Sequence, residues 1–109
     1  MRRPGRINLS TPVAMTWADA DGAARYARGR TLDLSASGMR IEVQNALPVW
    51  IYVTVNAHKI SLTTTASVRH CVRHRGKYLI GLEFSCPMNN LVERLAKKAE
   101  IAAAAAKLG

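Results

Sequence analysis

The sequence has little of several residue types that define other classes of protein. It has two cysteines in 109 residues, Cys71 and Cys86, and they form neither a CxxC pair nor a disulfide framework. Its longest apolar stretch, 101–106, is far too short to span a bilayer. No apolar segment follows the basic residues at the N-terminus, so a signal peptide is not expected. We therefore predict a cytoplasmic protein, whether the chain is complete or one domain excised from a longer one.

Acidic residues are also scarce. Seven Asp and Glu stand against 16 Lys and Arg, which gives a formal net charge of +9. This excess favours an anionic partner such as a nucleotide, a nucleic acid, an acidic protein or a lipid headgroup. It is equally compatible with a small domain that uses charge only to remain soluble. The length allows one domain, and 49% hydrophobic residues argue against global disorder.

Catalytic and metal-binding patterns are absent from the sequence. It contains no Ser-His-Asp arrangement, no paired carboxylates and no Gly-rich phosphate loop, so we expect a binding domain and not an enzyme. His70 and His74 share one face of a predicted strand, but they lie too far apart to chelate one ion. Cys71 lies on the opposite face. We expect no metal site and no cofactor.

Alternating apolar and polar residues dominate the centre of the chain. Val13, Met15 and Trp17 fall on one face of a strand, and similar patterns follow after turns rich in Gly, Asp and Ser. Short spacing and tight connections indicate antiparallel pairing, and a sheet of this size is most stable when it closes. The pattern predicts an all-β fold, a six-stranded antiparallel β-barrel with strands at about 12–18, 24–34, 39–43, 51–55, 60–74 and 78–84, and turns at 19–22, 35–38, 56–59 and 75–76.

The two ends of the chain differ from this centre. Residues 1–11 have no periodicity and are interpreted as a flexible arm that carries arginines; the barrel then covers 12–87. Residues 88–109 have a helical period, with Asn90 as the predicted cap and Glu93 at the capping-box position. We expect this helix to close one mouth of the barrel with a stripe of apolar side chains, namely Leu91, Leu95, Ala99 and Ala102.

Two short motifs carry the functional interpretation. Arg2 and Arg6 form an RxxxR spacing that includes Arg3, and residues 33–38 read DxSxxG at the end of a strand and its turn. With the sequence DLSASGMRIE and the closing strand YLIGLEF, the chain resembles the PilZ domain family over nearly its whole length. That resemblance implies a six-stranded barrel that binds cyclic di-GMP on its outer surface. It implies ligand contacts from Arg2, Arg3, Arg6, Asp33, Ser35 and Gly38.

The chemistry of these side chains agrees with that ligand. An arginine fork matches both phosphates and the O6 and N7 acceptors of guanine. Asp33 complements the N1–H and N2–H edge, Ser35 can donate a hydrogen bond, and Gly38 allows close backbone approach. Secondary contacts are predicted from Ser37, Arg40 and Arg69. The plainer interpretations are a solvated basic tail and an ordinary Asp-Ser turn, while Trp17 and Trp50 are assigned to core or rim packing.

We therefore predict a cyclic di-GMP receptor whose N-terminal arm becomes ordered on binding and which signals to a protein partner or an attached domain. Two alternatives remain open. One is a basic barrel that binds nucleic acid, a less favoured partner, and whose binding would weaken steeply with salt through counterion release. The other is a PilZ-like adaptor that needs no ligand and acts through protein–protein contacts.

Overall fold

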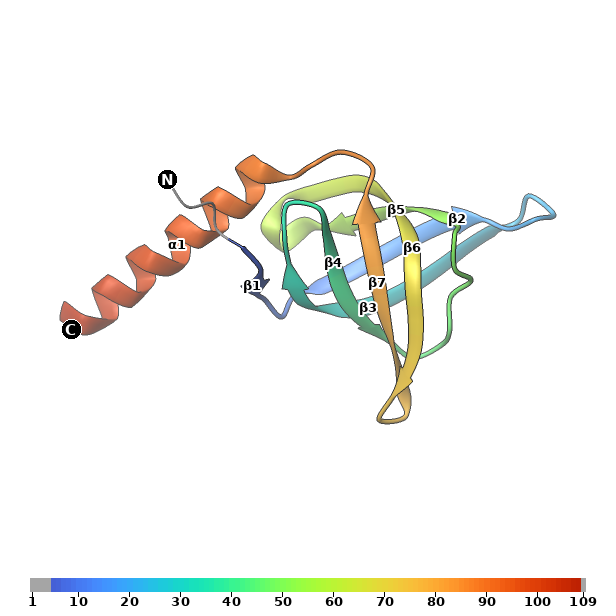
Figure 1. Ribbon diagram of the computed structural model, residues 1–109, viewed down its shortest axis with the longest axis horizontal. Coiled ribbons are helices and arrows are strands. Elements are labelled where there is room, and N and C mark those ends of the chain that lie inside the picture. The colour runs from blue at the N-terminus through green and yellow to red at the C-terminus, as the bar shows by residue number, and fades with distance from the viewer. Residues whose placement is uncertain (1–4, 109) are drawn as a thin grey trace.

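The computed structural model describes the backbone of residues 5–108 and the side chains of residues 5–98. It contains a closed antiparallel β-barrel of six strands, a short additional strand and one C-terminal helix (Figure 1). The predicted all-β barrel is confirmed. The elements are β1 (Ile7–Asn8), β2 (Pro12–Ala18), β3 (Ala24–Leu34), β4 (Gly38–Val43), β5 (Tyr52–Ala57), η1 (His58–Ile60), β6 (Leu62–His74), β7 (Lys77–Phe84) and α1 (Asn89–Leu108).

The barrel closes because β3 is paired along both of its edges. Its first part pairs with β2, its other edge pairs with β4, and the order β3-β2-β5-β6-β7-β4 returns to β3. All of these pairings are antiparallel. Closure leaves none of the six barrel strands with an unpaired edge along its whole length, which removes the usual site of edge-to-edge aggregation.

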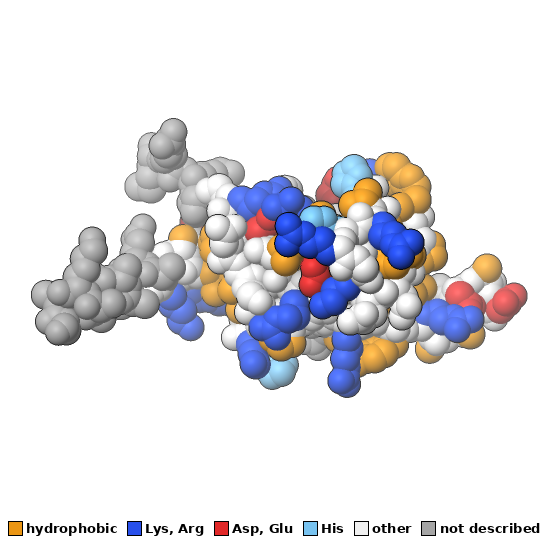
Figure 2. Space-filling model, turned by 90° about the horizontal axis from the view of Figure 1, so that it is seen from below, with side chains coloured by type: hydrophobic (Ala, Val, Ile, Leu, Met, Phe, Trp, Pro, Cys, Tyr) orange, Lys and Arg blue, Asp and Glu red, His pale blue; other side chains and the backbone are white. Residues whose placement is uncertain are grey.

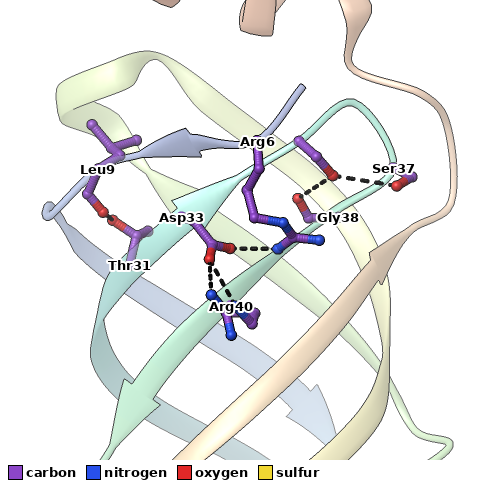
Figure 3. Close-up of polar contacts among 8 residues, drawn as sticks. Arg6, Leu9, Thr31, Asp33, Ser37, Gly38 and Arg40 are labelled. Carbon is purple, nitrogen blue, oxygen red and sulfur yellow. Dashed lines mark hydrogen bonds and ion pairs between the residues drawn. The ribbon is translucent and has the colours of Figure 1, made fainter. Parts of the chain in front are cut away.

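The strand β1 pairs with the end of β3, on the same edge as β2 but beyond the residues that β2 reaches. Ile7 pairs with Leu34 and Asn8 with Asp33, whereas Pro12 begins the β2 pairing. The fully buried Thr31 satisfies the backbone between the two segments: its hydroxyl donates to the Leu9 carbonyl at 2.6 Å and accepts from a backbone N–H at 2.9 Å (Figure 3). Two residues of the predicted arm, Ile7 and Asn8, therefore form a strand, which is too short to show a period in the sequence.

The core lies inside the barrel and is built from the alternate residues of its strands. It includes Val13, Met15, Ile41, Val55 and Ile80, all of them buried. Apolar burial of this kind contributes about 25 cal/mol per Å² and is the main force that stabilises a small barrel. Trp17 packs against this core as predicted, in a half-buried position.

The connection between β5 and β6 differs from the predicted turn at 56–59. β5 continues to Ala57, and one turn of 3₁₀ helix, η1, follows. Ser61 then adopts the left-handed region with φ 54° and carries the chain into β6. The hydrophobic Ile60 of η1 is buried, so tertiary packing and not turn chemistry decides this connection.

The helix α1 begins at Asn89, so the predicted cap, Asn90, lies inside its first turn. Its first residues contribute Leu91 and Val92 to the core cluster, and the half-buried Leu95 packs against that cluster. The rest of the helix extends away from the barrel (Figure 1). The predicted stripe members Ala99 and Ala102 lie beyond the side chains that the structure describes. No helix within residues 5–108 is long and apolar enough to cross a membrane.

Candidate functional site

A groove of about 450 Å³ lies on the outer wall of the barrel. It runs over β4, β6 and β7 and is bounded by the turn that joins β3 to β4. Six residues predicted from the sequence line it, and they come from segments far apart in the chain: Arg6, Ser35, Ser37, Gly38, Arg40 and Arg69. Arg2 and Arg3 lie outside the described residues.

Asp33 lies directly beneath two of these arginines. Arg6 Nη1 donates to Asp33 Oδ1 at 2.6 Å, and Arg40 Nε donates to Asp33 Oδ2 at 2.7 Å. A second nitrogen of Arg40 also bonds to Oδ2. Figure 3 shows Arg6 reaching over from the segment before β1 and Arg40 approaching from β4, so that the two meet at β3. The Asp33 side chain is 1% exposed, whereas both arginines are about half exposed.

The local strand pairing explains this convergence. The register of β3 shifts between Thr31 and Asp33 against β4, which brings Arg40 opposite Asp33. On the other edge of β3, Asn8 pairs with Asp33, which places Arg6 close to the same carboxylate. A β-bulge of this kind redirects side chains at a defined point in a strand. Strands β3 and β4, together with the segment before β1, therefore bring one anion and two cations to the rim of the groove.

The two guanidinium groups keep Asp33 ionised. Burial by itself raises the pKa of the Asp33 carboxyl, but the hydrogen bonds from Arg40 and Arg6, together with their charges, outweigh it. The net effect is a pKa below the ordinary value of 3.8. In return, the hydrogen bond and charge of Asp33 raise the pKa of Arg40. At neutral pH the cluster therefore consists of one carboxylate and two guanidinium ions, with a net positive charge.

The turn from Ser35 to Gly38 is held by backbone hydrogen bonds. Ser35 N–H donates to the Gly38 carbonyl at 2.8 Å, and Phe84 N–H donates to the Ser37 carbonyl at 2.8 Å. The Ser35 hydroxyl lies 3.3 Å from both the Gly38 carbonyl and the Ser37 hydroxyl. Both serines line the groove, so the turn brings two hydroxyl groups to it on a fixed backbone. Figure 3 shows Ser37 and Gly38 in this turn.

Gly38 has a structural reason to be glycine. A Cβ atom at this position would collide with the carbonyl oxygen of Leu82 on the neighbouring strand β7. Backbone cannot move aside as the end of a flexible side chain can, so any larger residue would push β4 away from β7. This requirement exists whether or not a ligand approaches the turn.

Arg69 forms another part of the groove wall. The register of β6 shifts between Val68 and His70, and Arg69 lies at this irregularity. Its Nε donates to Ser67 Oγ at 2.9 Å, and Nη2 lies 3.2 Å from Glu83 Oε1. Its guanidinium carbon also lies 4.5 Å from the centroid of the Trp50 ring. Trp50, predicted to pack in the core or at its rim, lies outside the core: the residue is 67% exposed, and its ring stacks on Arg69.

Sequence reasoning missed part of the groove. The one sequence signal for its remaining lining residues on β6 and β7 is the alternation of inward and outward side chains. The register shift at Arg69 interrupts this signal, because beyond it the side chains of β6 exchange faces. His70 is therefore exposed, while Cys71 packs partly against the core. The missed lining residues are His70, Val72, Leu79, Gly81, Leu82 and Glu83, together with the buried Met39 beneath the turn.

The wider surface carries many positive charges. Lys and Arg side chains are spread over the face shown in Figure 2, with acidic side chains between them. Two of the acidic side chains in the described part of the chain form surface ion pairs, Glu42 with Lys77 and Asp19 with Arg25. In the part of the chain that the structure describes, no group of three or more His, Cys, Asp or Glu residues could hold a metal ion.

Comparison with known proteins agrees with the fold and with the family resemblance found in the sequence. The family model of the PilZ domain matches residues 2–98. No curated protein is similar enough in sequence to count as a match.

Among solved structures, YcgR in complex with c-di-GMP from Escherichia coli has a TM-score of 0.67 and 20% identity; the alignment covers 99% of this chain and 50% of that one. The MrkH–c-di-GMP complex of K. pneumonia has a TM-score of 0.65 and 13% identity, with coverage of 94% and 54%. The PilZ domain with c-di-GMP of YcgR from E. coli has a TM-score of 0.56 and 17% identity, with coverage of 97% and 99%. At these identities the likeness establishes the fold alone, and this chain spans about half the length of the larger relatives.

Proposed function

Since this chain belongs to the PilZ domain family, we propose that it is a binding domain for cyclic di-GMP and that the ligand occupies the groove over β4, β6 and β7. The observation that carries the proposal is the cluster at the rim, where buried Asp33 holds Arg6 and Arg40 together. The similar structures of YcgR and MrkH are complexes with this ligand.

The cluster has donors left over for an anionic ligand. A guanidinium group has five N–H donors, of which Arg6 gives one to Asp33 and Arg40 gives two. The remaining donors belong to side chains that line the groove and are half exposed. They match the phosphate oxygens and the O6 and N7 acceptors of guanine, which an arginine fork can bind in pairs.

Asp33 has two roles in this proposal. In the structure its oxygens accept from Arg6 and Arg40, which holds both arginines at the rim. The same oxygens are the natural partners of the N1–H and N2–H edge of guanine. Binding therefore exchanges one arginine contact for a guanine contact, and the released guanidinium is free to turn toward a phosphate.

The N-terminal arm supplies the conformational step that we propose. The strand β1 already fixes the chain from Ile7 onward, so only the residues before it need to settle over the ligand. Fixing each residue costs about 1–2 kcal/mol of backbone entropy, and contacts from Arg2 and Arg3 to the ligand would offset that cost. The closed arm would present a new surface to a protein partner or an attached domain.

Calorimetric titration with cyclic di-GMP tests the binding site. Arg6→Ala and Asp33→Ala are each expected to weaken binding about tenfold to a hundredfold, as the loss of a charge-assisted hydrogen bond requires. Arg25→Ala is the matched control, because Arg25 forms a similar pair with Asp19 at 2.8 Å outside the groove. A wild type that gives no binding heat refutes the proposal, as does equal binding by all three variants.

Two further measurements test the mechanism and the nearest alternative. Hydrogen exchange of the amides before Ile7 is expected to slow when the ligand binds; unchanged exchange would rule out the arm closure.

Raising the salt concentration is expected to weaken binding of this small ligand only modestly. A steep linear fall of log K with log salt for an oligonucleotide, without any cyclic di-GMP binding, would favour the nucleic-acid alternative.

A further inference from the structure

Trp50 has a backbone conformation that the fold alone does not explain. It lies between β4 and β5 with φ 68°, in the left-handed region that bulky residues rarely adopt. The residue is 67% exposed, so burial does not offset the strained backbone. The conformation is held by the Trp50 N–H, which donates to the Val68 carbonyl at 2.6 Å, while Val68 N–H donates to the Ile51 carbonyl. Strain that persists at one exposed residue is a reason to look for a function.

The contact that this conformation creates is with Arg69. The guanidinium carbon lies 4.5 Å from the ring centroid, well within the range of a cation–π interaction. The same guanidinium also donates two hydrogen bonds, from Nε to Ser67 Oγ and from Nη2 to Glu83 Oε1. Arg69 is thus held on three sides, and of the two stacked residues it alone lines the groove.

We propose that Trp50 is a positioning residue for ligand binding, which acts by holding the guanidinium of Arg69 toward the groove. This inference rests on the proposed function, because the group that Arg69 would meet is a phosphate or a guanine of cyclic di-GMP. A long arginine side chain loses rotamer freedom when it binds a ligand. The stack on Trp50 removes part of that freedom before the ligand arrives, so less is lost on binding.

Affinity measurements on variants of the pair test the coupling. Trp50→Ala is expected to weaken cyclic di-GMP binding about threefold to tenfold, in line with the strength of an exposed or partly desolvated cation–π contact. Trp50→Phe keeps a ring and should recover most of the loss. In an Arg69→Ala background, Trp50→Ala should have no further effect, because the group that it positions has been removed.

Trp50→Gly separates a binding role from a structural one. Glycine adopts positive φ without strain, so this variant should resist urea at least as well as Trp50→Ala. It should nevertheless bind the ligand as weakly as Trp50→Ala does. The matched control is Tyr26→Ala, which removes another exposed ring that stacks on an arginine, Arg28, outside the groove. This control should bind like the wild type.

Fluorescence adds a direct view of the stack. In a Trp17→Phe variant, Trp50 is the one remaining tryptophan, so Arg69→Ala should change its emission without ligand, and cyclic di-GMP should change it in the parent variant. A wild type that does not bind the ligand overturns both proposals. A wild type that binds, with Trp50→Ala binding equally well or with equal losses in both Arg69 backgrounds, overturns the positioning role alone.

Discussion

Replacing Gly38 by alanine tests how closely β4 packs against β7 at the rim of the groove. Gly38 is the first residue of β4, is buried, and pairs with Glu83. The added Cβ would fall on the carbonyl oxygen of Leu82, which belongs to the backbone and has no rotamer to change. The strand or the turn must therefore move.

The expected cost follows from this geometry. Overpacking of a well-filled site costs about 1–3 kcal/mol, which lowers the midpoint of thermal unfolding by roughly 4–8 °C for each kcal/mol in a domain of about this size. Two other glycines are controls. Gly5→Ala has no atom within 4 Å and should leave stability unchanged, whereas Gly22→Ala has open space but φ 81° and should cost about 1–2 kcal/mol through the backbone alone.

Urea denaturation of the three variants, followed by circular dichroism, provides the measurement. The expected order of stability is Gly5→Ala first, Gly22→Ala second and Gly38→Ala equal to the second or lower. Because the Ser35 N–H and hydroxyl both contact the Gly38 carbonyl, ligand binding by Gly38→Ala should also weaken. If Gly38→Ala unfolds at the same urea concentration as Gly5→Ala, the steric argument is wrong.

Two other predictions concern charge and packing. Asp33 has a lowered pKa in the folded protein, so its contribution to stability is complete above its ordinary pKa of 3.8 and is lost as the pH falls through the folded value. Asp33→Asn should therefore be less stable than the wild type in urea at pH 7, and the difference in stability should narrow as the pH falls below 3.8. A difference that does not change with pH would contradict the assigned ionisation. Val92→Ala should lower the free energy of unfolding by about 1.5–3 kcal/mol, because Val92 on α1 is 1% exposed. Val49→Ala, at an exposed position, should lower it by less than about 0.5 kcal/mol. Equal effects of the two changes would show that α1 does not cover the core.

Much of the fold could be predicted because its signals are local. Alternation at Val13, Met15 and Trp17 marks a half-buried strand, and the turn at Arg75 and Gly76 has the positive φ values of 51° and 78° that such a reversal requires. The connection after β5 could not be predicted in this way. There the burial of Ile60 replaces an ordinary turn with η1, and that burial depends on distant strands.

The candidate site likewise has a part that the sequence predicts and a part that it does not. The motif residues Arg6, Asp33 and Ser35 could be picked out from the RxxxR and DxSxxG spacings, and the resemblance to the PilZ domain family assigned them to the ligand site. The pairing of Arg40 with Asp33 and the stack of Arg69 on Trp50 were not visible. Both depend on strand irregularities, at Thr31/Asp33 and at Val68/His70, which change the face that a side chain occupies.

The amino-acid sequence by itself determined that this protein is a basic β-barrel with an arginine-bearing N-terminal segment and an Asp-Ser-Gly turn. These properties follow from composition, from the period of the apolar residues and from motif spacing, all of which can be recognised along the chain without knowledge of distant contacts. Only the tertiary structure decided that Asp33 would be buried beneath two half-exposed arginines and that Arg69 would be held against an exposed tryptophan. Contacts of that kind depend on the register of strands that lie far apart in the chain, and register is settled when the whole barrel closes.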